Sequence, residues 1–176
     1  MTENLHALLT GVHGGAFSRM QVGVGLLEAL HFNLFRGVRS HCGRCRSHDF
    51  GSEHLIFGPH RSAHRGDVPR ELTNIFDGFR QTLRHLEGDP DAPNYESTAL
   101  RSALQLHADV IRVHPFEDGN GRSGRALMDV VLVRLGLRPL PIEVPKQEYL
   151  AALNYYYQTN DLDALQDMAL RIYALP

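Results

Sequence analysis

Long apolar runs are missing from this chain of 176 residues. No stretch approaches the roughly 20 apolar residues that a helix needs to cross a bilayer, and the N-terminal Met-Thr-Glu-Asn lacks the basic start and apolar run of a secretory signal. We therefore expect a cytoplasmic protein without a membrane partner. Delivery as a secreted effector stays open, because an effector exported by a specialised machine carries no such signal either.

An excess of charge of one sign is also missing. The 18 lysines and arginines are balanced by 20 aspartates and glutamates, which leaves a formal net charge of -2. Such a balance produces no field that would hold nucleic acid or an anionic membrane by electrostatics alone. We expect no nucleic-acid partner, and any phosphate chemistry has to come from a local site.

Cysteine is scarce, with Cys42 and Cys45 the only two. In a chain without a secretory signal they are expected to stay reduced. Their C-x-x-C spacing, with His41 and His48 nearby, is compatible with a zinc site or a redox pair. Zinc sites of this kind usually need a second pair of ligands, and none follows at a suitable interval, so two ordinary loop cysteines are the favoured interpretation.

Apolar spacing predicts a mainly α fold built as one domain. Residues at three- and four-residue intervals indicate helices that include 22–35, 72–86, 100–111, 122–135, 149–157 and 162–172. Before them, Gly11, Gly14 and Gly15 interrupt the pattern. We expect residues 1–20 to form a loosely ordered leader and residues 21–176 to form the domain.

A short β-prone run lies in the polar segment between the first two of these helices. It consists of Leu55, Ile56 and Phe57 and is closed by Gly58-Pro59. Such a run followed by a turn predicts a small β-hairpin, which we call the flap.

Residues 114–125 stand between two predicted helices and read His-Pro-Phe-Glu-Asp-Gly-Asn-Gly-Arg-Ser-Gly-Arg. The helix before them has to stop ahead of Pro115, because a proline disfavours helical geometry at the preceding residue. Gly119 and Gly121 can adopt positive φ, so that backbone N–H groups turn inward beside the start of the next helix. The segment therefore predicts an anion hole.

The polar side chains that follow fit a polyphosphate. Arg122 and Arg125 share one side of a first helical turn, where cations oppose the helix macrodipole unless an anion lies between them. Two guanidinium groups suit several phosphate oxygens, and Asn120 can donate its amide to another. Asp118 offers the single carboxylate that suits Mg²⁺ beside phosphates.

Three further side chains surround this loop. His114 can accept a hydroxyl proton as that oxygen attacks phosphorus, because an imidazole titrates near neutral pH. Phe116 is expected to plug the loop into the core, and Glu117 receives no role. His107, on the apolar face of the helix before the loop, is expected to be a core histidine that braces it.

The tetrapeptide Asp-Gly-Asn-Gly at 118–121 is by itself compatible with a tight turn and nothing more. The whole segment, however, resembles the signature of the Fic family, His-Pro-Phe-x-Asp-Gly-Asn-Gly-Arg-x-x-Arg, with every specified position present. The similarity extends to Gly43-Arg44-Cys45-Arg46, where the family has a tyrosine in place of Cys45. In all it covers residues 21–173, which implies a Fic-type helical domain with a short flap.

The resemblance implies a role for each loop residue. His114 would be the catalytic base and Asp118 would hold Mg²⁺. The backbone of Gly119–Gly121 would surround the α-phosphate of ATP. The β- and γ-phosphates would face Arg122 and Arg125.

A kinase-like branch of the family lacks the final arginine and has lysine in place of the last loop glycine, whereas this chain keeps Gly121 and Arg125. The resemblance therefore implies transfer of AMP from ATP to a Ser, Thr or Tyr hydroxyl of a target protein, with release of pyrophosphate. The same fold using UMP, phosphocholine or phosphate as the transferred group is an alternative. A Fic-like module that binds nucleotide without turnover is another, against which the intact His114 argues.

The resemblance also bears on partners. In the family a target segment pairs with the edge of the flap, which implies docking at Leu55–Phe57. Many members restrain themselves with a helix that carries Ser or Thr, three residues, Glu and then Gly or Asn. No glutamate here has Ser or Thr four residues before it, and the nearest match, Thr73 to Gly78, carries Asp77 instead. We expect no built-in inhibitory helix, and any restraint to come from a separate antitoxin-like protein or from regions outside the given sequence.

Overall fold

A computed structural model describes residues 2–141 and 144–173 of the chain. It contains these helices and strands in chain order: α1 Thr2–His13, α2 Val24–Phe35, β1 Ile56–Phe57, β2 His60–Arg61, α3 Val68–Gly88, α4 Tyr95–Val113, α5 Asn120–Arg134, α6 Lys146–Thr159 and α7 Asp163–Tyr173. The mainly α fold class is confirmed, and the expected flap is an antiparallel pair with Ile56 opposite Arg61 and Phe57 opposite His60.

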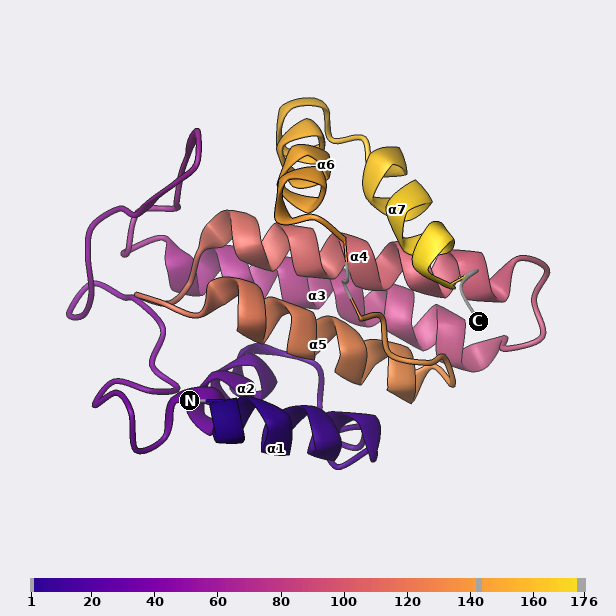
Figure 1. Cartoon of the computed structure of the whole chain (residues 1–176), viewed down its shortest axis with the longest axis horizontal. Coiled ribbons are helices and arrows are strands. Elements are labelled where there is room, and N and C mark those ends of the chain that lie inside the picture. Colours follow the sequence, from indigo (N-terminus) through magenta and orange to yellow (C-terminus); the bar gives the residue numbers. More distant parts are fainter. Residues whose placement is uncertain (1, 142–143, 174–176) are drawn as a thin grey trace.

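The helices are stacked around α4 and α5 (Figure 1). On one side α4 contacts α3, α6 and α7, and on the other side α5 contacts α1 and α2. The two central helices approach closely at Gly124, because a Cβ there would lie 3.1 Å from Ile111 Cγ1. Both flap strands and the loop between α4 and α5 lie at one end of this stack, on the left of the view.

Local sequence accounts for most helix boundaries. α3 begins with Pro69 in its first turn, where the missing N–H costs nothing, and buries Leu72, Phe76, Leu83 and three other apolar residues along one face. Asp67, the residue before this helix, pairs through its carboxylate with Arg70 at 2.9 Å and makes no capping bond. α5 begins two residues earlier than expected and is buried on most sides, as its apolar composition predicts.

The N-terminal segment differs from the loosely ordered leader expected from its glycines. Residues Thr2–His13 form α1, which packs on α2 and α5 and buries Leu8 and Val12. Only Gly11 lies inside the helix, in its last turn, whereas Gly14 and Gly15 follow its end. Burial of the apolar face against two helices therefore outweighs the weak helix propensity of one glycine.

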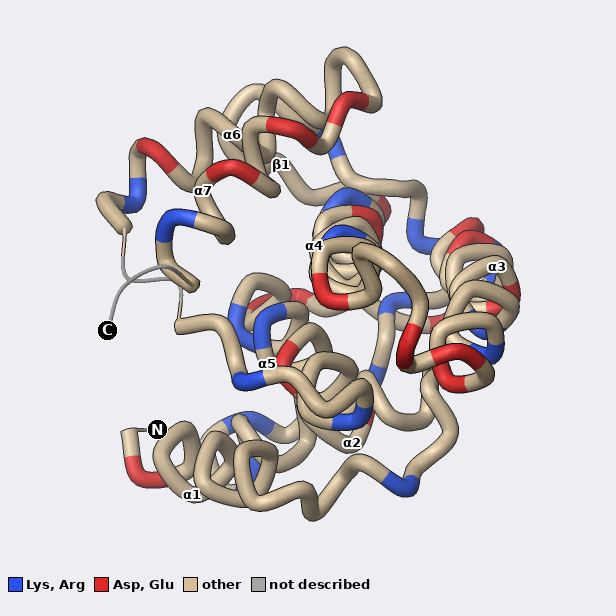
Figure 2. The backbone as a smooth tube through the Cα atoms, turned by 90° about the vertical axis from the view of Figure 1, so that its right-hand side faces the viewer, with Lys and Arg blue, Asp and Glu red and all other residues tan. Residues whose placement is uncertain are grey.

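Charges of both signs lie on α3, α4 and α5 (Figure 2). Several form surface pairs between neighbouring turns or neighbouring helices, such as Arg101 with Asp163 and Arg134 with Glu87. Within the described ranges, no helix is both long and apolar enough to cross a membrane.

The packing of α1 predicts a stability difference between two neighbouring positions. Leu8→Ala should lower the free energy of unfolding by about 2–4 kcal/mol, because it empties a buried site, whereas Thr10→Ala removes an exposed side chain and should change it little. Urea titrations followed by circular dichroism measure both. Equal and negligible losses would mean that α1 is only loosely held.

Candidate active site

The loop between α4 and α5 begins at a residue whose backbone conformation ends the helix. α4 ends at Val113, and His114 adopts a left-handed conformation with φ of 56° ahead of Pro115. A second left-handed residue, Gly119, has φ of 80° and caps the start of α5. A Cβ at Gly119 would overlap the ring of Phe35, so both conformation and space require glycine at this position.

His114 presents one ring nitrogen to the site and uses the other to hold its place. Its Nδ1 lies 3.2 Å from the carbonyl oxygen of Ile111 and therefore carries the proton that this bond needs. The imidazole stacks on Phe57 of the flap, with ring centroids 4.2 Å apart. Nε2 is left with a lone pair for a substrate proton.

Burial lowers the pKa of His114 below the ordinary value of 6.5. The carbonyl of Ile111 opposes this shift, the positive charge of Arg46 adds to it, and the carboxylate of Asp118 opposes it. The neutral imidazole is therefore the dominant form at pH 7, as a general base requires.

Arg46 is a fully buried arginine that fixes the position of His114. Its guanidinium donates to the carbonyl oxygens of Val113 and His114 at the end of α4, and to those of Ser52 and Ala63 on either side of the flap, at 2.7–3.2 Å. These bonds tie His114 to the segment that carries the flap. Sequence reasoning gave Arg46 no role. The residue lies in a polar segment, where no apolar spacing indicates that an arginine is buried.

His31 supports the other half of the loop from α2. Its Nε2 donates to the carbonyl of Asp118 at 3.1 Å and its Nδ1 accepts from the N–H of Gly43 at 2.8 Å, while its ring stacks on Phe116. Burial lowers its pKa to about 4, so this bracing is uncharged at pH 7. Phe116 has no exposed surface, which matches its expected function as a plug in the core.

Glu117, to which the sequence assigned no role, ties the loop to the segment before the flap. Its carboxylate accepts from both the backbone N–H and the hydroxyl of Ser52. The neighbouring Gly51 leaves room for it, because a Cβ there would lie 2.6 Å from Oε1 of Glu117.

Asn120 does not present its side chain to a ligand as the sequence suggested. Its Oδ1 accepts from the N–H of Phe116 and its Nδ2 donates to the carbonyl of the same residue, both at 2.8 Å. The side chain is buried and closes the loop on itself. Its contribution toward an anion is therefore the backbone N–H in the first turn of α5, where N–H groups have no partner within the helix.

Cationic side chains surround that helix start. Asp118 is half exposed and lies 3.4 Å from Arg122 and 3.6 Å from Arg39, which comes from the segment after α2. Arg122 also lies over the ring of Phe35. The predicted anion hole is thus lined by side chains and by N–H groups of the kind that bind phosphate.

Two adjoining cavities lie beside His114. One, of about 280 Å³, is lined by His114, by residues 117–122 of the loop and by Arg125. The other, of about 580 Å³, extends from His114, Gly121 and Arg125 to the flap and α6. Because these three residues line both cavities, a ligand can place an anionic group in the first and an apolar ring in the second.

The larger cavity is closed by the flap and α6. His60 of β2 bonds to the side chain of Asn154 at 2.7 Å and packs edge-on against Tyr157. Of the three consecutive tyrosines, only Tyr157 lines this cavity, while Tyr155 is exposed and Tyr156 bonds to Asp109. Divergence along the helix thus prevents a common stacking surface.

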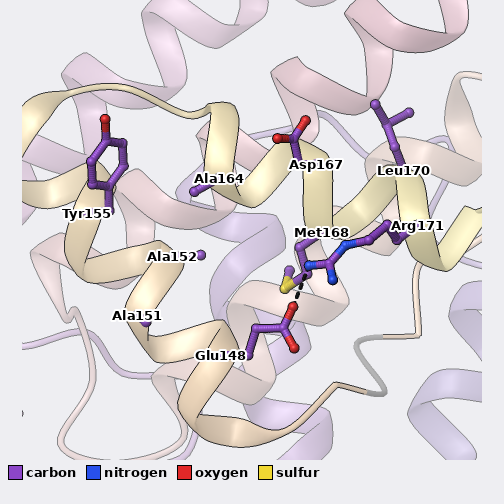
Figure 3. Close-up of a pocket in the computed structure, with 9 residues that line it drawn as sticks. All are labelled: Glu148, Ala151, Ala152, Tyr155, Ala164, Asp167, Met168, Leu170 and Arg171. Carbon is purple, nitrogen blue, oxygen red and sulfur yellow. Dashed lines mark hydrogen bonds and ion pairs between the residues drawn. The ribbon is translucent and has the colours of Figure 1, made fainter.

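A third cavity, of about 770 Å³, lies between α6 and α7 and is remote from this chemistry. Its walls carry Tyr155, Asp167 and Leu170, and an ion pair between Glu148 and Arg171 crosses it (Figure 3). No residue of the loop lines it.

The C-x-x-C segment forms neither a disulfide nor a metal site in this structure. Cys42 and Cys45 are free thiols, and burial together with the nearby Glu28 raises the pKa of Cys45. Among residues 2–141 and 144–173, no three side chains of the metal-binding types come together.

A family model described as the Fic/DOC family matches residues 21–132. Named relatives include a Fic protein adenylyltransferase of Culex quinquefasciatus, 28% identical over 74% of this chain, and adenylyltransferase fic-1 of Caenorhabditis elegans, 37% identical over 41%. A ribonucleoside-diphosphate reductase small chain of Ostreid herpesvirus 1 is 31% identical over 57% of the chain. The chain spans only 24%, 15% and 16% of these proteins, respectively.

Solved structures share the fold at lower identity. The BepC effector of Bartonella tribocorum with bound AMPPNP superimposes with a TM-score of 0.70 at 16% identity, covering 97% of this chain and 86% of that one. The N-terminal Fic domain of a translocated Bep effector of Bartonella quintana with bound ADP gives 0.72 at 17% identity, covering 97% and 85%.

Gly119 and Gly136 both adopt the left-handed backbone conformation, which allows a matched test of the loop. Gly119→Ala should cost the strain of a left-handed alanine, about 1–2 kcal/mol, plus a further 1–3 kcal/mol, roughly, for the overlap with Phe35. Gly136→Ala, at φ of 77° with open space around it, should cost the strain alone. Thermal melts compare the two, and equal losses would show that the loop does not hold Gly119 against Phe35.

Proposed function

Because the chain belongs to the Fic/DOC family, we propose that it is a protein adenylyltransferase, which transfers AMP from ATP to a Ser, Thr or Tyr hydroxyl of a target protein. The observation that carries this proposal is the placement of a neutral His114 at the junction of an anion hole and an apolar cavity. The relatives named as adenylyltransferases support the same reaction.

In the proposed reaction the target hydroxyl oxygen attacks the α-phosphorus of ATP. Nε2 of His114 accepts the hydroxyl proton, the bond from phosphorus to the bridging oxygen breaks, and pyrophosphate leaves. The N–H groups at the start of α5 and the guanidinium of Arg122 stabilise the charge on the phosphates. The ring of the nucleotide would occupy the cavity that the flap and α6 enclose, beside Tyr157.

Asp118 fits the requirements of Mg²⁺ bound mainly through substrate phosphates. It offers one half-exposed carboxylate beside the anion hole, and no second acidic group or histidine joins it into a three-ligand cluster in the described part of the chain. Mg²⁺ takes few protein ligands and keeps several waters. When bound, it would supply positive charge to the phosphate oxygens.

The flap would hold the target. Ile56 is 74% exposed, so the outer edge of β1 is accessible to an added strand. Phe57, the next residue, stacks on His114, which would bring a docked hydroxyl close to the base. Main-chain pairing of this kind imposes little sequence preference on the target.

Restraint by a separate antitoxin-like protein belongs to the same proposal. Asp77, the nearest approach to an inhibitory glutamate, lies on α3 and pairs with Arg80. It is thus committed to a surface pair on its own helix. The wild-type chain, without any activating substitution, should therefore label itself or a target.

Incubation with ATP labelled at the α-phosphate, with CTP, GTP and UTP in parallel, tests the proposal. The wild type should transfer label to protein, and His114→Ala should abolish transfer while calorimetry finds ATP affinity within a few-fold. Because the pKa of His114 is lowered, activity should fall only as the pH drops below about 6.5. If label is transferred by His114→Ala, or if ATP affinity collapses with activity, His114 is not the base.

The metal assignment has its own measurement. Asp118→Asn should raise the Mg²⁺ concentration needed for half-maximal ATP binding by about tenfold, whereas Asp77→Asn, another exposed acidic position, should leave it unchanged. Calorimetric titrations of ATP across a Mg²⁺ series give both values. An unchanged Mg²⁺ requirement in Asp118→Asn would remove this residue from the metal site.

A further inference from the structure

Arg125 lies where the two cavities meet. To bind a ligand there, its guanidinium has to be held in a fixed orientation by neighbouring groups. It lines both cavities and forms no ion pair with any residue in the ranges 2–141 and 144–173. A guanidinium on a long flexible stem gains little from binding an anion if ordering the side chain costs most of that gain. The groups behind it therefore decide how well it can serve a phosphate.

Tyr149 of α6 is a polar residue that lines the larger cavity together with Arg125. Its ring is buried, and its hydroxyl lies 2.7 Å from Nε2 of His107. Burial raises the pKa of Tyr149 to about 12, while the charge of Arg125 and a hydrogen bond from it act in the opposite direction. The hydroxyl is thus protonated at pH 7, and Tyr149 lines the same cavity as Arg125 while its hydroxyl bonds to His107.

Arg125, Tyr149 and His107 form a row of three polar side chains, and His107 of α4 is its buried end. It has no exposed surface, and burial lowers its pKa to about 4, so the ring is neutral. Its Nδ1 makes no regular hydrogen bond among the described residues but packs against Gly124, the residue before Arg125 in the chain, and the Gly124 backbone opposes the fall in the pKa of His107. A buried histidine with one unsatisfied nitrogen is a costly choice for packing alone.

The directions of the bonds follow from what each group can do. Arg125 only donates, so the oxygen of Tyr149 accepts from it. The proton of that hydroxyl then needs an acceptor, and Nε2 of the neutral His107 lies within reach. The row therefore runs across three helices, from α4 through α6 to the arginine of α5.

We propose that Tyr149 and His107 are positioning residues that hold Arg125 toward the outer phosphates of the nucleotide. The proposal rests on the proposed function, since it takes the occupant of the two cavities to be ATP. The buried His107 fixes the hydroxyl of Tyr149, and that hydroxyl in turn restricts the guanidinium of Arg125. The guanidinium then loses less conformational entropy when it binds phosphate. Neither residue has to touch the reacting atoms.

The test compares two tyrosines that line the same cavity. Tyr149→Phe keeps the ring and removes the hydroxyl, and should weaken ATP binding about three- to tenfold more than AMP binding. Tyr157→Phe is the matched control, because its hydroxyl bonds to the backbone of Ala108 and not to Arg125. It should alter ATP and AMP binding equally. Calorimetry with ATP and AMP, and thermal melts of each variant, supply the values.

His107→Leu removes the acceptor from a position outside the cavity and should shift the ATP-to-AMP ratio in the same direction. In the Arg125→Ala background, Tyr149→Phe should have no further effect on that ratio. An unchanged ratio in Tyr149→Phe or His107→Leu, or an undiminished effect of Tyr149→Phe without Arg125, overturns the proposal. If Arg125→Ala itself leaves the ratio unchanged, the assignment of the outer phosphates fails, and the proposed function with it.

Discussion

The buried guanidinium of Arg46 is the interaction on which the site depends. It bonds to the end of α4 and to both sides of the flap, which are separated along the chain by α3 and most of α4. Burial lowers the pKa of Arg46 and the carboxylate of Glu117 opposes that shift, so the charge is retained beside its acceptors. Without this side chain, the carbonyl groups of Ser52, Ala63, Val113 and His114 would lose this donor at once. For the buried carbonyl of Val113 the cost would be about 1–3 kcal/mol.

The same contact explains how an unfavourable backbone conformation is kept at His114. A left-handed conformation costs a residue with a Cβ about 1–2 kcal/mol, and His114 adopts it. Two hydrogen bonds from Arg46 reach the carbonyl of His114, and a third group, the ring of Phe57, covers its imidazole. Backbone strain at His114 is thus balanced by bonds from a part of the chain 68 residues away.

Sequence reasoning succeeded where the cause is local. The spacing of apolar residues marked α2 to α7, and the order of histidine, glycine and arginine in one short segment marked the loop. It missed what depends on distant contacts. The helix Thr2–His13 needs the faces of α2 and α5, Arg46 needs carbonyl groups from elsewhere, and the inward turn of the Asn120 side chain needs the closed loop. Such bonds leave no periodicity to read.

The charges at the start of α5 are unfavourable for the helix by itself and favourable for binding an anionic ligand. Arg122 and Arg125 lie in the first two turns, at the positive end of the helix dipole, where cations are unfavourable. Asp118 compensates only in part, since its contacts of 3.4 and 3.6 Å are long for charge-assisted hydrogen bonds and the carboxylate is half exposed. A neutral His114 lines the same cavity as both arginines. An anionic polyphosphate bound there would face two guanidinium groups and the positive end of the helix dipole, an arrangement that a single carboxylate does not match.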